Sequence, residues 1–337
     1  MSAWGALVAR ARGLSGHLLS RETLRLLAGS DDRRAFTEAL VRIGYLAFAP
    51  NAPPPDAWAV EVAIRRVAAR RFDVLARWSR DCGDVLVPLL EDEDRRSLRA
   101  ILRGAVGRVP HDARTAGLIP TAALPARALD ELALLNDIGA VGAALIALGH
   151  PFGAVVAEES RRELPDLFAL DQAIARAWAA RATRAAQHGD AALRLYVQRS
   201  IDLQNLWAAR LLAEQSADAD ADAMFVPGGG LVTVDDLRYA VATRSVDALA
   251  ARLAPRVART PLAAALGPAA DAPDDAALAA LIAEFRGRAR FAPLGLSLVI
   301  VYILRLRTEH RALLRTLWQL SLGVPRDLRL RAREAAA

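Results

Sequence analysis

The segment Tyr196-Val197-Gln198-Arg199-Ser200-Ile201-Asp202-Leu203-Gln204-Asn205-Leu206 carries a short pattern that recurs through the chain. Its acid, Asp202, is followed three positions later by Asn205 and then by Leu206. Residues at i, i+3 and i+4 share one face of a helix, so these three side chains would lie together. The pattern therefore predicts a helix that presents a carboxylate, an amide and an apolar anchor on one face.

The pattern occurs three times at nearly constant spacing. Its members are Asp94/Ser97/Leu98, Asp202/Asn205/Leu206 and Glu309/Ala312/Leu313, and the acids are 108 and 107 positions apart. A second mark, which we call the repeat head, precedes each acid; the three heads are residues 19–24, 124–129 and 232–237. A leucine stands 21 positions after the start of each head, namely Leu40, Leu145 and Leu253. Repetition at a fixed period indicates one structural unit built several times. We predict three similar modules, residues 1–115, 116–228 and 229–337.

Composition favours an all-α fold. The 337 residues are 54% hydrophobic but only 5% aromatic, and three units of this length fit ordinary domain sizes. Much of the hydrophobic fraction is alanine, which has the highest helix propensity and little preference for strands. Segments rich in proline, glycine or alternating alanine and aspartate predict loops at 50–56, at 216–223 and at 261–275, the last as a flexible insertion in the third module.

Each acid has arginines near it in the sequence. Arg99 and Arg103 follow Asp94, Arg199 and Arg210 flank Asp202, and Arg315 follows Glu309. A buried carboxylate needs polar partners, and these arginines are candidates. Two roles are open for the acids: an active carboxylate present three times, or a polar contact that fixes the packing of the modules. The second is favoured, because a residue that recurs in every module is a property of the scaffold.

Recognisable catalytic and cofactor motifs are absent from the sequence. There is no phosphate-binding P-loop, no dinucleotide fingerprint and no serine-nucleophile elbow. The five histidines are not spaced as zinc ligands, and Cys82 stands alone. Gly228-Gly229-Gly230 carries no lysine and follows no predicted strand, so we interpret it as a hinge between modules. We expect no catalytic, cofactor-binding or metal-binding residues, which makes an enzyme the weakest hypothesis.

Two eleven-residue apolar stretches, 138–148 and 294–304, are too short to cross a bilayer and are predicted to be buried core helices.

The formal charge is +6, and every basic residue other than histidine is arginine. The alternative function is that of a helical-repeat scaffold or a nucleic-acid-binding protein. Two arginine clusters suggest the latter: Arg65, Arg66, Arg70 and Arg71, and Arg326, Arg329, Arg331 and Arg333. Acids are interspersed and aromatic residues are few, which favours solvated helix faces over a nucleic-acid surface.

Beyond these patterns, the chain resembles the C subunits of bacterial and archaeal rotary A/V-type ATPases, which correspond to the d subunit of the eukaryotic V-ATPase, in the AC39-like family. The resemblance rests on residues 9–14 with Leu18-Leu19, on 94–104 with Leu118-Ile119-Pro120, on the central helix 196–206, and on Tyr302 through Glu309 with Arg315 and Gly323. Ser97 and Ala312 depart from it, since an asparagine-like residue is expected at both positions. The 261–275 insertion is a further departure.

The resemblance implies three helical domains in a pseudo-threefold funnel and a non-catalytic rotor subunit. It implies a socket that links the central stalk to the membrane proteolipid ring and carries torque for ATP-coupled proton or sodium transport. The partners that it implies are central-stalk subunits of the D/F type, the c/L-type proteolipid ring and, indirectly, the catalytic A/B head. No cofactor, small-molecule substrate or nucleic acid is implied. The implied location is peripheral, at the cytoplasmic face of the plasma membrane.

Overall fold

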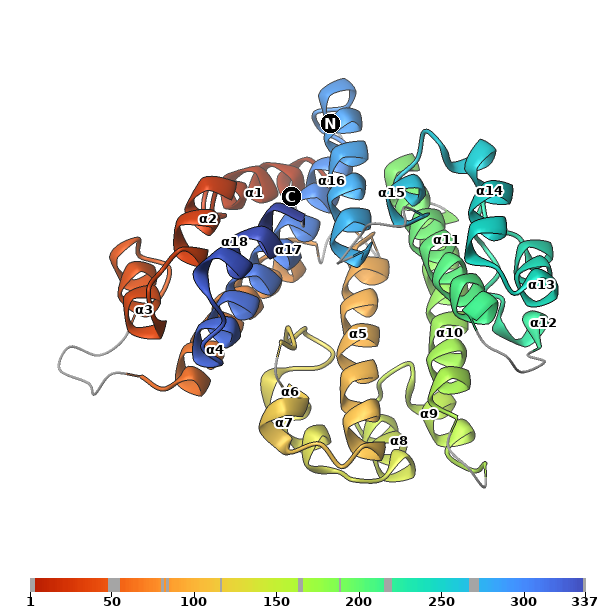
Figure 1. Ribbon diagram of the computed structural model, residues 1–337, viewed down its shortest axis with the longest axis horizontal. Helices are drawn as coiled ribbons and strands as arrows, with labels where there is room; N and C mark the ends of the chain where they lie inside the picture. Colours follow the sequence, from red (N-terminus) through yellow and green to blue (C-terminus); the bar gives the residue numbers. More distant parts are fainter. Residues whose placement is uncertain are drawn as a thin grey trace. The chain divides into compact units, whose positions relative to one another are not determined.

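The computed structural model is built of helices throughout the part that it describes (Figure 1). That part is residues 4–335 except 48–54, 80–81, 83–84, 116, 163–165, 188, 215–219 and 267–272. Within it no strand occurs, which confirms the prediction of an all-α chain. The two apolar stretches are helical over most of their length, at 138–147 in α8 and from 297 in α17. They are not buried throughout, because Ile146, Leu148 and Leu294 are exposed.

The chain divides into two compact units. The first comprises residues 1–81, 115–126 and 269–337. Its helices are α1 (Gly5–Ser15), α2 (Arg21–Ala28), α3 (Arg33–Arg42), α4 (Ala57–Trp78), α16 (Pro273–Phe291), α17 (Ser297–Ser321) and α18 (Arg326–Ala335). The second comprises residues 82–114 and 127–268. Its helices are α5 (Val87–Val106), α6 (His111–Thr115), α7 (Ala126–Leu134), α8 (Ile138–Ala147), α9 (Gly153–Glu159), α10 (Leu167–Gln187), α11 (Ala191–Glu214), α12 (Ala221–Met224), α13 (Val234–Thr243), α14 (Val246–Val257) and α15 (Leu262–Leu266), with the ends of α6 and α7 at the boundary.

The helices follow the register of the sequence repeat. The helices α2, α7 and α13 begin two residues after the start of a repeat head, at Arg21, Ala126 and Val234. The next helix has its N-cap 13 positions after the start of the head; the caps are Asp32, Asp137 and Ser245, and each side chain accepts a backbone N–H three residues on. Such caps stabilise a helix by satisfying a backbone donor that has no partner inside the helix. Two long helices then complete each repeat: α4 and α5, α10 and α11, and α16 and α17.

Part of two predicted loops is helical. The short helix α12 occupies 221–224, because the Asp220 side chain accepts the N–H groups of Asp222 and Ala223. The helix α15 occupies 262–266, where the sequence is alanine-rich, and α16 begins at Pro273. The remaining residues of these segments, 216–219 and 267–272, and most of the predicted loop 50–56, lie outside the described residues.

The second long helix of each repeat packs on the short helices of the repeat that follows. The helix α5 contacts α8, and α11 contacts α13 and α14, all within the second unit. Within the first unit α17, which closes the last repeat, contacts α2 and α3 of the first repeat and also runs beside α4 (Figure 1). The first repeat therefore contacts the second, the second contacts the third, and the third contacts the first.

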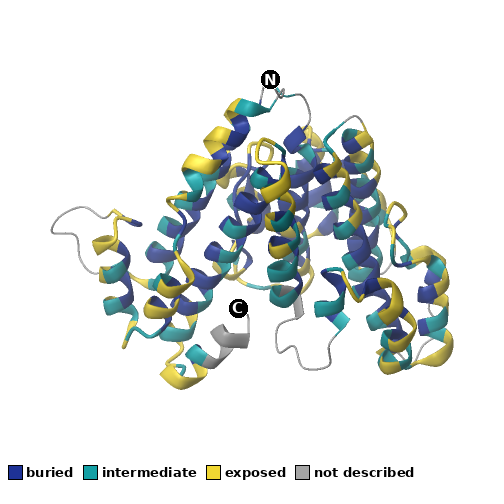
Figure 2. Ribbon diagram, turned by 90° about the horizontal axis from the view of Figure 1, so that it is seen from above, coloured by how far each residue is buried: buried dark blue, intermediate teal, exposed yellow. Residues whose placement is uncertain are grey.

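The core of the first unit shows what this packing buries. Leu40, which stands 21 positions after its head, and Leu313, which follows Glu309, belong to one cluster with Phe36 and Leu317. All four are at most 1% exposed. Figure 2 shows that buried residues follow one side of most helices, whereas exposed residues gather at turns and helix ends. Burying a leucine or phenylalanine side chain stabilises the fold by about 1.5–3 kcal/mol, so this apolar contact holds the two ends of the chain together.

Candidate functional site: the buried carboxylates

Asp202 lies on α11 and binds the backbone just before α13. Its Oδ1 accepts the N–H groups of Gly230, Leu231 and Val232 at 2.9, 2.8 and 3.2 Å. The side chain is fully buried, and Arg199 Nη1 lies 3.8 Å from Oδ2. Burial raises the pKa of Asp202 above its ordinary value, although these three N–H groups and Arg199 act in the opposite direction. The carboxylate thus fixes the head of the third repeat.

The glycine run at 228–230 is shaped by this carboxylate. A Cβ on Gly229 would stand 2.4 Å from Asp202 Oδ1, closer than any real contact allows. Gly228 has φ +109°, a conformation that residues with a Cβ rarely adopt. The run was predicted to be a hinge; in the structure it lets the backbone close around Asp202 and present its N–H groups to it.

Asn205 extends the same contact. Its Nδ2 donates to the carbonyl oxygen of Val226 at 2.8 Å, and its Oδ1 accepts the Val226 N–H at 2.9 Å. Leu206 is fully buried beside it. The acid, amide and leucine of the sequence pattern therefore share one buried face of α11, and both polar members bind the segment that leads into the third repeat.

Glu309 makes the corresponding contact from α17 to the first repeat. Its Oε2 accepts the Leu19 N–H at 2.5 Å, and its Oε1 forms an ion pair with Arg71. Leu19 starts the first repeat head, as Val232 starts the third. Tyr45 lies beside Glu309. Burial is the larger cause that raises the pKa of the Tyr45 phenol, and the charge of Glu309 raises it further. The amide position of this repeat holds Ala312, which is buried and adds no polar contact.

Asp94, on α5, faces the second repeat. It is 1% exposed, and its Oδ2 lies 3.5 Å from His150 Nε2, just beyond the end of α8. Ser97 and Leu98 are both buried on the same helix. All three acids of the sequence pattern are thus buried. Each faces another repeat: Asp94 faces the second, Asp202 the third and Glu309 the first.

Tyr45 and His150 were missed by the sequence analysis, although a signal for them was present. Each stands 26 positions after the start of its repeat head, directly after a glycine with positive φ, Gly44 or Gly149. Each lies beside the acid of the preceding repeat. The corresponding position in the third repeat is Ala258, where no polar contact can form. Aligning the three heads beyond their first 21 positions would have revealed the pair.

The arginines next to the acids in the sequence mostly bind elsewhere, which corrects that expectation. Arg103 Nη2 binds Asp171 at 2.6 Å, Arg210 Nη1 donates to the Ala265 carbonyl oxygen at 2.7 Å, and Arg315 Nη2 binds Asp275 at 2.5 Å. These arginines stand six to nine positions after their acids, so the helix turns them onto another face or carries them too far along the axis. Arg199, three positions before Asp202, does approach its acid.

Comparison with known proteins identifies the family. A profile of the family described as "ATP synthase (C/AC39) subunit" matches residues 7–328, nearly the whole chain.

The chain belongs to the C/AC39 family of ATP synthase subunits.

A curated relative agrees with this assignment. The C subunit of the A-type ATP synthase of Haloquadratum walsbyi is 27% identical over 183 residues. The match spans about half of each protein, 53% of this chain and 53% of the relative. The family resemblance stated from the sequence is therefore confirmed.

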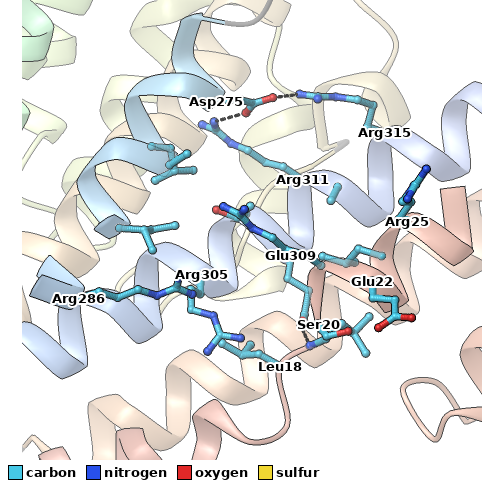
Figure 3. A pocket seen from close by; sticks show the side chains of 18 residues that line it. Leu18, Ser20, Glu22, Arg25, Asp275, Arg286, Arg305, Glu309, Arg311 and Arg315 are labelled. Carbon is cyan, nitrogen blue, oxygen red and sulfur yellow. Dashed lines mark hydrogen bonds and ion pairs between the residues drawn. The ribbon is translucent and has the colours of Figure 1, made fainter. Parts of the chain in front are cut away.

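This C/AC39 chain also has a pocket beside Glu309. It lies in the first unit, between the first repeat head with α2 on one side and α16 and α17 on the other, with a volume of about 810 Å³. Asp275 binds Arg311 and Arg315 at one end, and Arg286 and Arg305 lie together at the other, near Leu18 (Figure 3). In the described residues no group of three or more metal-ligating side chains gathers, and no helix there is both long and apolar enough to span a bilayer.

Proposed function

We propose that this chain is the non-catalytic rotor subunit of an A/V-type ATPase, a socket between the central stalk and the membrane proteolipid ring. The single observation that carries the proposal is the cyclic use of the three carboxylates in a member of the C/AC39 family. Asp202 and Glu309 each accept a backbone N–H of another repeat, the third and the first, and Asp94 lies 3.5 Å from His150 of the second repeat. A chain whose repeats contact one another in this order suits a subunit that must transmit torque without separation of its repeats.

The proposed arrangement is three helical domains, 1–115, 116–228 and 229–337, around a pseudo-threefold axis. Two features support it: the helix register that recurs with each repeat head, and the packing of each closing long helix on the next repeat. The proposed partners are the D/F-type stalk subunits and the c/L-type ring, with the catalytic A/B head reached through the stalk. We place the protein at the cytoplasmic face of the plasma membrane, bound peripherally.

Nucleic-acid binding is less well supported by the arginine clusters. Arg65 is buried and donates to the Leu118 carbonyl oxygen, and Arg71 binds Glu309 and the His17 carbonyl oxygen. In the second cluster Arg329 is 5% exposed and donates to the carbonyl oxygens of Ala28 and Ser30. These three arginines hold the fold together, so the exposed charge that the clusters offer to a phosphate backbone is reduced to Arg66, Arg70 and Arg326 among the described side chains.

The proposal is tested by deleting the gene for this chain in its host and preparing inverted membrane vesicles from the deletion strain. ATP-driven ion uptake should be lost and should return when the wild-type chain is supplied, while ATP hydrolysis by the isolated catalytic head persists. Ion uptake that continues at the normal rate without the chain would contradict a coupling role. Loss of hydrolysis in the isolated head would contradict the non-catalytic assignment.

A further inference from the structure

The pocket between α2, α16 and α17 has the size and the lining of a ligand site. Its volume of about 810 Å³ falls within the range of about 300–1,000 Å³ that small-molecule sites occupy. Its apolar lining includes Leu24 of α2 and Leu278 and Ile282 of α16. Charged side chains from all three helices line the rest, so the pocket can accommodate a ligand with one charged and one apolar part.

The charge in the pocket is strongly unbalanced. Six arginines line it against three carboxylates; the arginines are Arg21, Arg25, Arg286, Arg305, Arg311 and Arg315, and the carboxylates are Glu22, Asp275 and Glu309. Two of the carboxylates are already engaged: Asp275 binds Arg311 and Arg315, and Glu309 binds Arg71, which is not a lining residue. The pocket therefore carries an excess of three positive charges.

Three of the arginines account for this excess. No carboxylate in the described part of the chain forms an ion pair with Arg21, Arg286 or Arg305. Arg305 is half-buried, and Figure 3 shows it beside Arg286. Arg21 and Arg286 are exposed; the partial covering of the Arg286 guanidinium, and then the charges of Arg305 and Arg21, lower the pKa of Arg286. Arginines that lie together with no paired carboxylate give this end of the pocket a positive potential, which attracts an anion.

Two of these arginines, Arg305 and Arg21, have no counterpart in the other repeats. Arg305 stands four positions before the acid of its repeat, and the equivalent positions in the other repeats are Leu90 and Gln198. Arg21 stands two positions after the start of its head, where the other repeats have Ala126 and Val234. Arg21 and Arg305 are thus specific to one junction, between the third and first repeats, and the repeated packing of the modules does not explain them.

We propose that this pocket binds a phosphate-bearing ligand, with its phosphate groups on Arg21, Arg286 and Arg305 and its apolar part against Leu278 and Ile282. Guanidinium groups bind phosphate oxygens through paired N–H donors, which a more strongly hydrated lysine ammonium does less well. Two sources share this chemistry: a free phosphorylated molecule and the head group of an acidic phospholipid. The proposal is independent of the rotor function, because it rests on the pocket alone.

The test uses the purified full chain and inorganic pyrophosphate, titrated by calorimetry at two salt concentrations. We expect saturable binding at one site. The double variant R286Q/R305Q should weaken it by at least about tenfold, since two charge-assisted contacts are lost. The matched control is R34Q/R127Q, which removes the same charge from two exposed arginines paired with Glu38 and Glu131 outside the pocket. It should bind pyrophosphate as the wild type does, and equal thermal melting curves would show that the variants fold.

A second arm distinguishes the two sources of phosphate. The chain is sedimented with phosphatidylcholine vesicles that contain or lack phosphatidic acid, with and without pyrophosphate. Binding to the acidic vesicles that R286Q/R305Q abolishes and pyrophosphate displaces would assign a lipid head group. Pyrophosphate binding without vesicle binding would assign a free ligand. If neither probe binds, or if R34Q/R127Q weakens binding as much as R286Q/R305Q, the proposed site is wrong.

Discussion

Asp202 Oδ1 accepts the backbone N–H of Val232, and Glu309 Oε2 accepts the backbone N–H of Leu19, the residue at the same place in another repeat. Both carboxylates sit on a long closing helix and bind the start of a repeat head. Both contacts join one repeat to another, and on this ground we propose a scaffold role for these acids. A buried carboxylate that accepts backbone N–H groups orients a chain segment firmly. Separating the two would leave buried donors and a buried acceptor without partners, which costs free energy.

The first prediction concerns the Asp202 carboxylate. Replacing it by alanine (D202A) leaves the buried N–H of Val232 and the part-buried N–H groups of Gly230 and Leu231 without their acceptor. We expect the free energy of unfolding to fall by about 3–5 kcal/mol, measured by urea denaturation. Asp247 is exposed in the first turn of α14, and D247A should change stability by less than about 1 kcal/mol. Equal effects of the two substitutions would contradict the assigned role of Asp202.

The glycine run offers a sharper comparison, because two adjacent glycines have different surroundings. A Cβ at Gly229 would collide with Asp202 Oδ1, whereas a Cβ at Gly230 would meet nothing within 4 Å. G229A should therefore destabilise the chain by about 1–3 kcal/mol, and G230A should leave the melting temperature nearly unchanged. Equal effects of G229A and G230A would show that the backbone does not close around Asp202 in this manner.

The helices and their register could be predicted from the sequence, because alanine-rich periodic segments, breakers and the three heads are local signals. The shared face of Asp202, Asn205 and Leu206 was predictable for the same reason. The partners were harder to predict. Arg210 stands eight positions after Asp202, about 12 Å further along the helix, so closeness in sequence did not bring the two side chains together.

Contacts between distant segments were the part that sequence reasoning could not supply. Nothing near Glu309 in the sequence points to Leu19 or Arg71, which lie 290 and 238 positions away. His150 has no acid close by in the sequence, and only the fold brings Asp94 to it. The grouping of both chain ends into one compact unit likewise depends on the packing of α17, which a local pattern does not encode.

The Glu309–Arg71 pair provides a third prediction. The Glu309 carboxylate is 2% exposed and Arg71 is 13% exposed, so water screens their interaction weakly. In a double-mutant cycle of E309Q and R71Q, we expect a coupling free energy of about 1–3 kcal/mol. The exposed pair Arg34–Glu38, treated in the same way with R34Q and E38Q, should show no measurable coupling. An absence of coupling between Glu309 and Arg71 would show that the ion pair does not stabilise the contact between the third and first repeats.

A fourth prediction concerns pH. His310 is 1% exposed, and its Nε2 lies 3.2 Å from the Gly117 carbonyl oxygen. Burial lowers its pKa from 6.5 to about 4, with Arg65 and Arg311 acting in the same direction. Below pH 6.5 the unfolded chain therefore binds a proton that the folded chain does not, so stability falls as the pH drops from 6.5 to 4. The loss should reach about 3 kcal/mol.

The variant H310Q isolates this effect, because a glutamine amide can donate to Gly117 without titrating. Urea denaturation from pH 7 to pH 4 should show a smaller loss of stability for H310Q than for the wild type. Parallel pH profiles for the two proteins would mean that His310 is not held neutral in the folded chain.

The most direct test of the central claim is a tagged purification of this chain from gently solubilised native membranes, with the co-purifying subunits identified by mass. The rotor assignment predicts recovery with central-stalk subunits, a proteolipid ring and the catalytic head. The variant D202A should reduce that recovery, and D247A should not. Recovery of the wild-type chain alone, in the soluble fraction and without any other component of a rotary ATPase, would contradict the assignment.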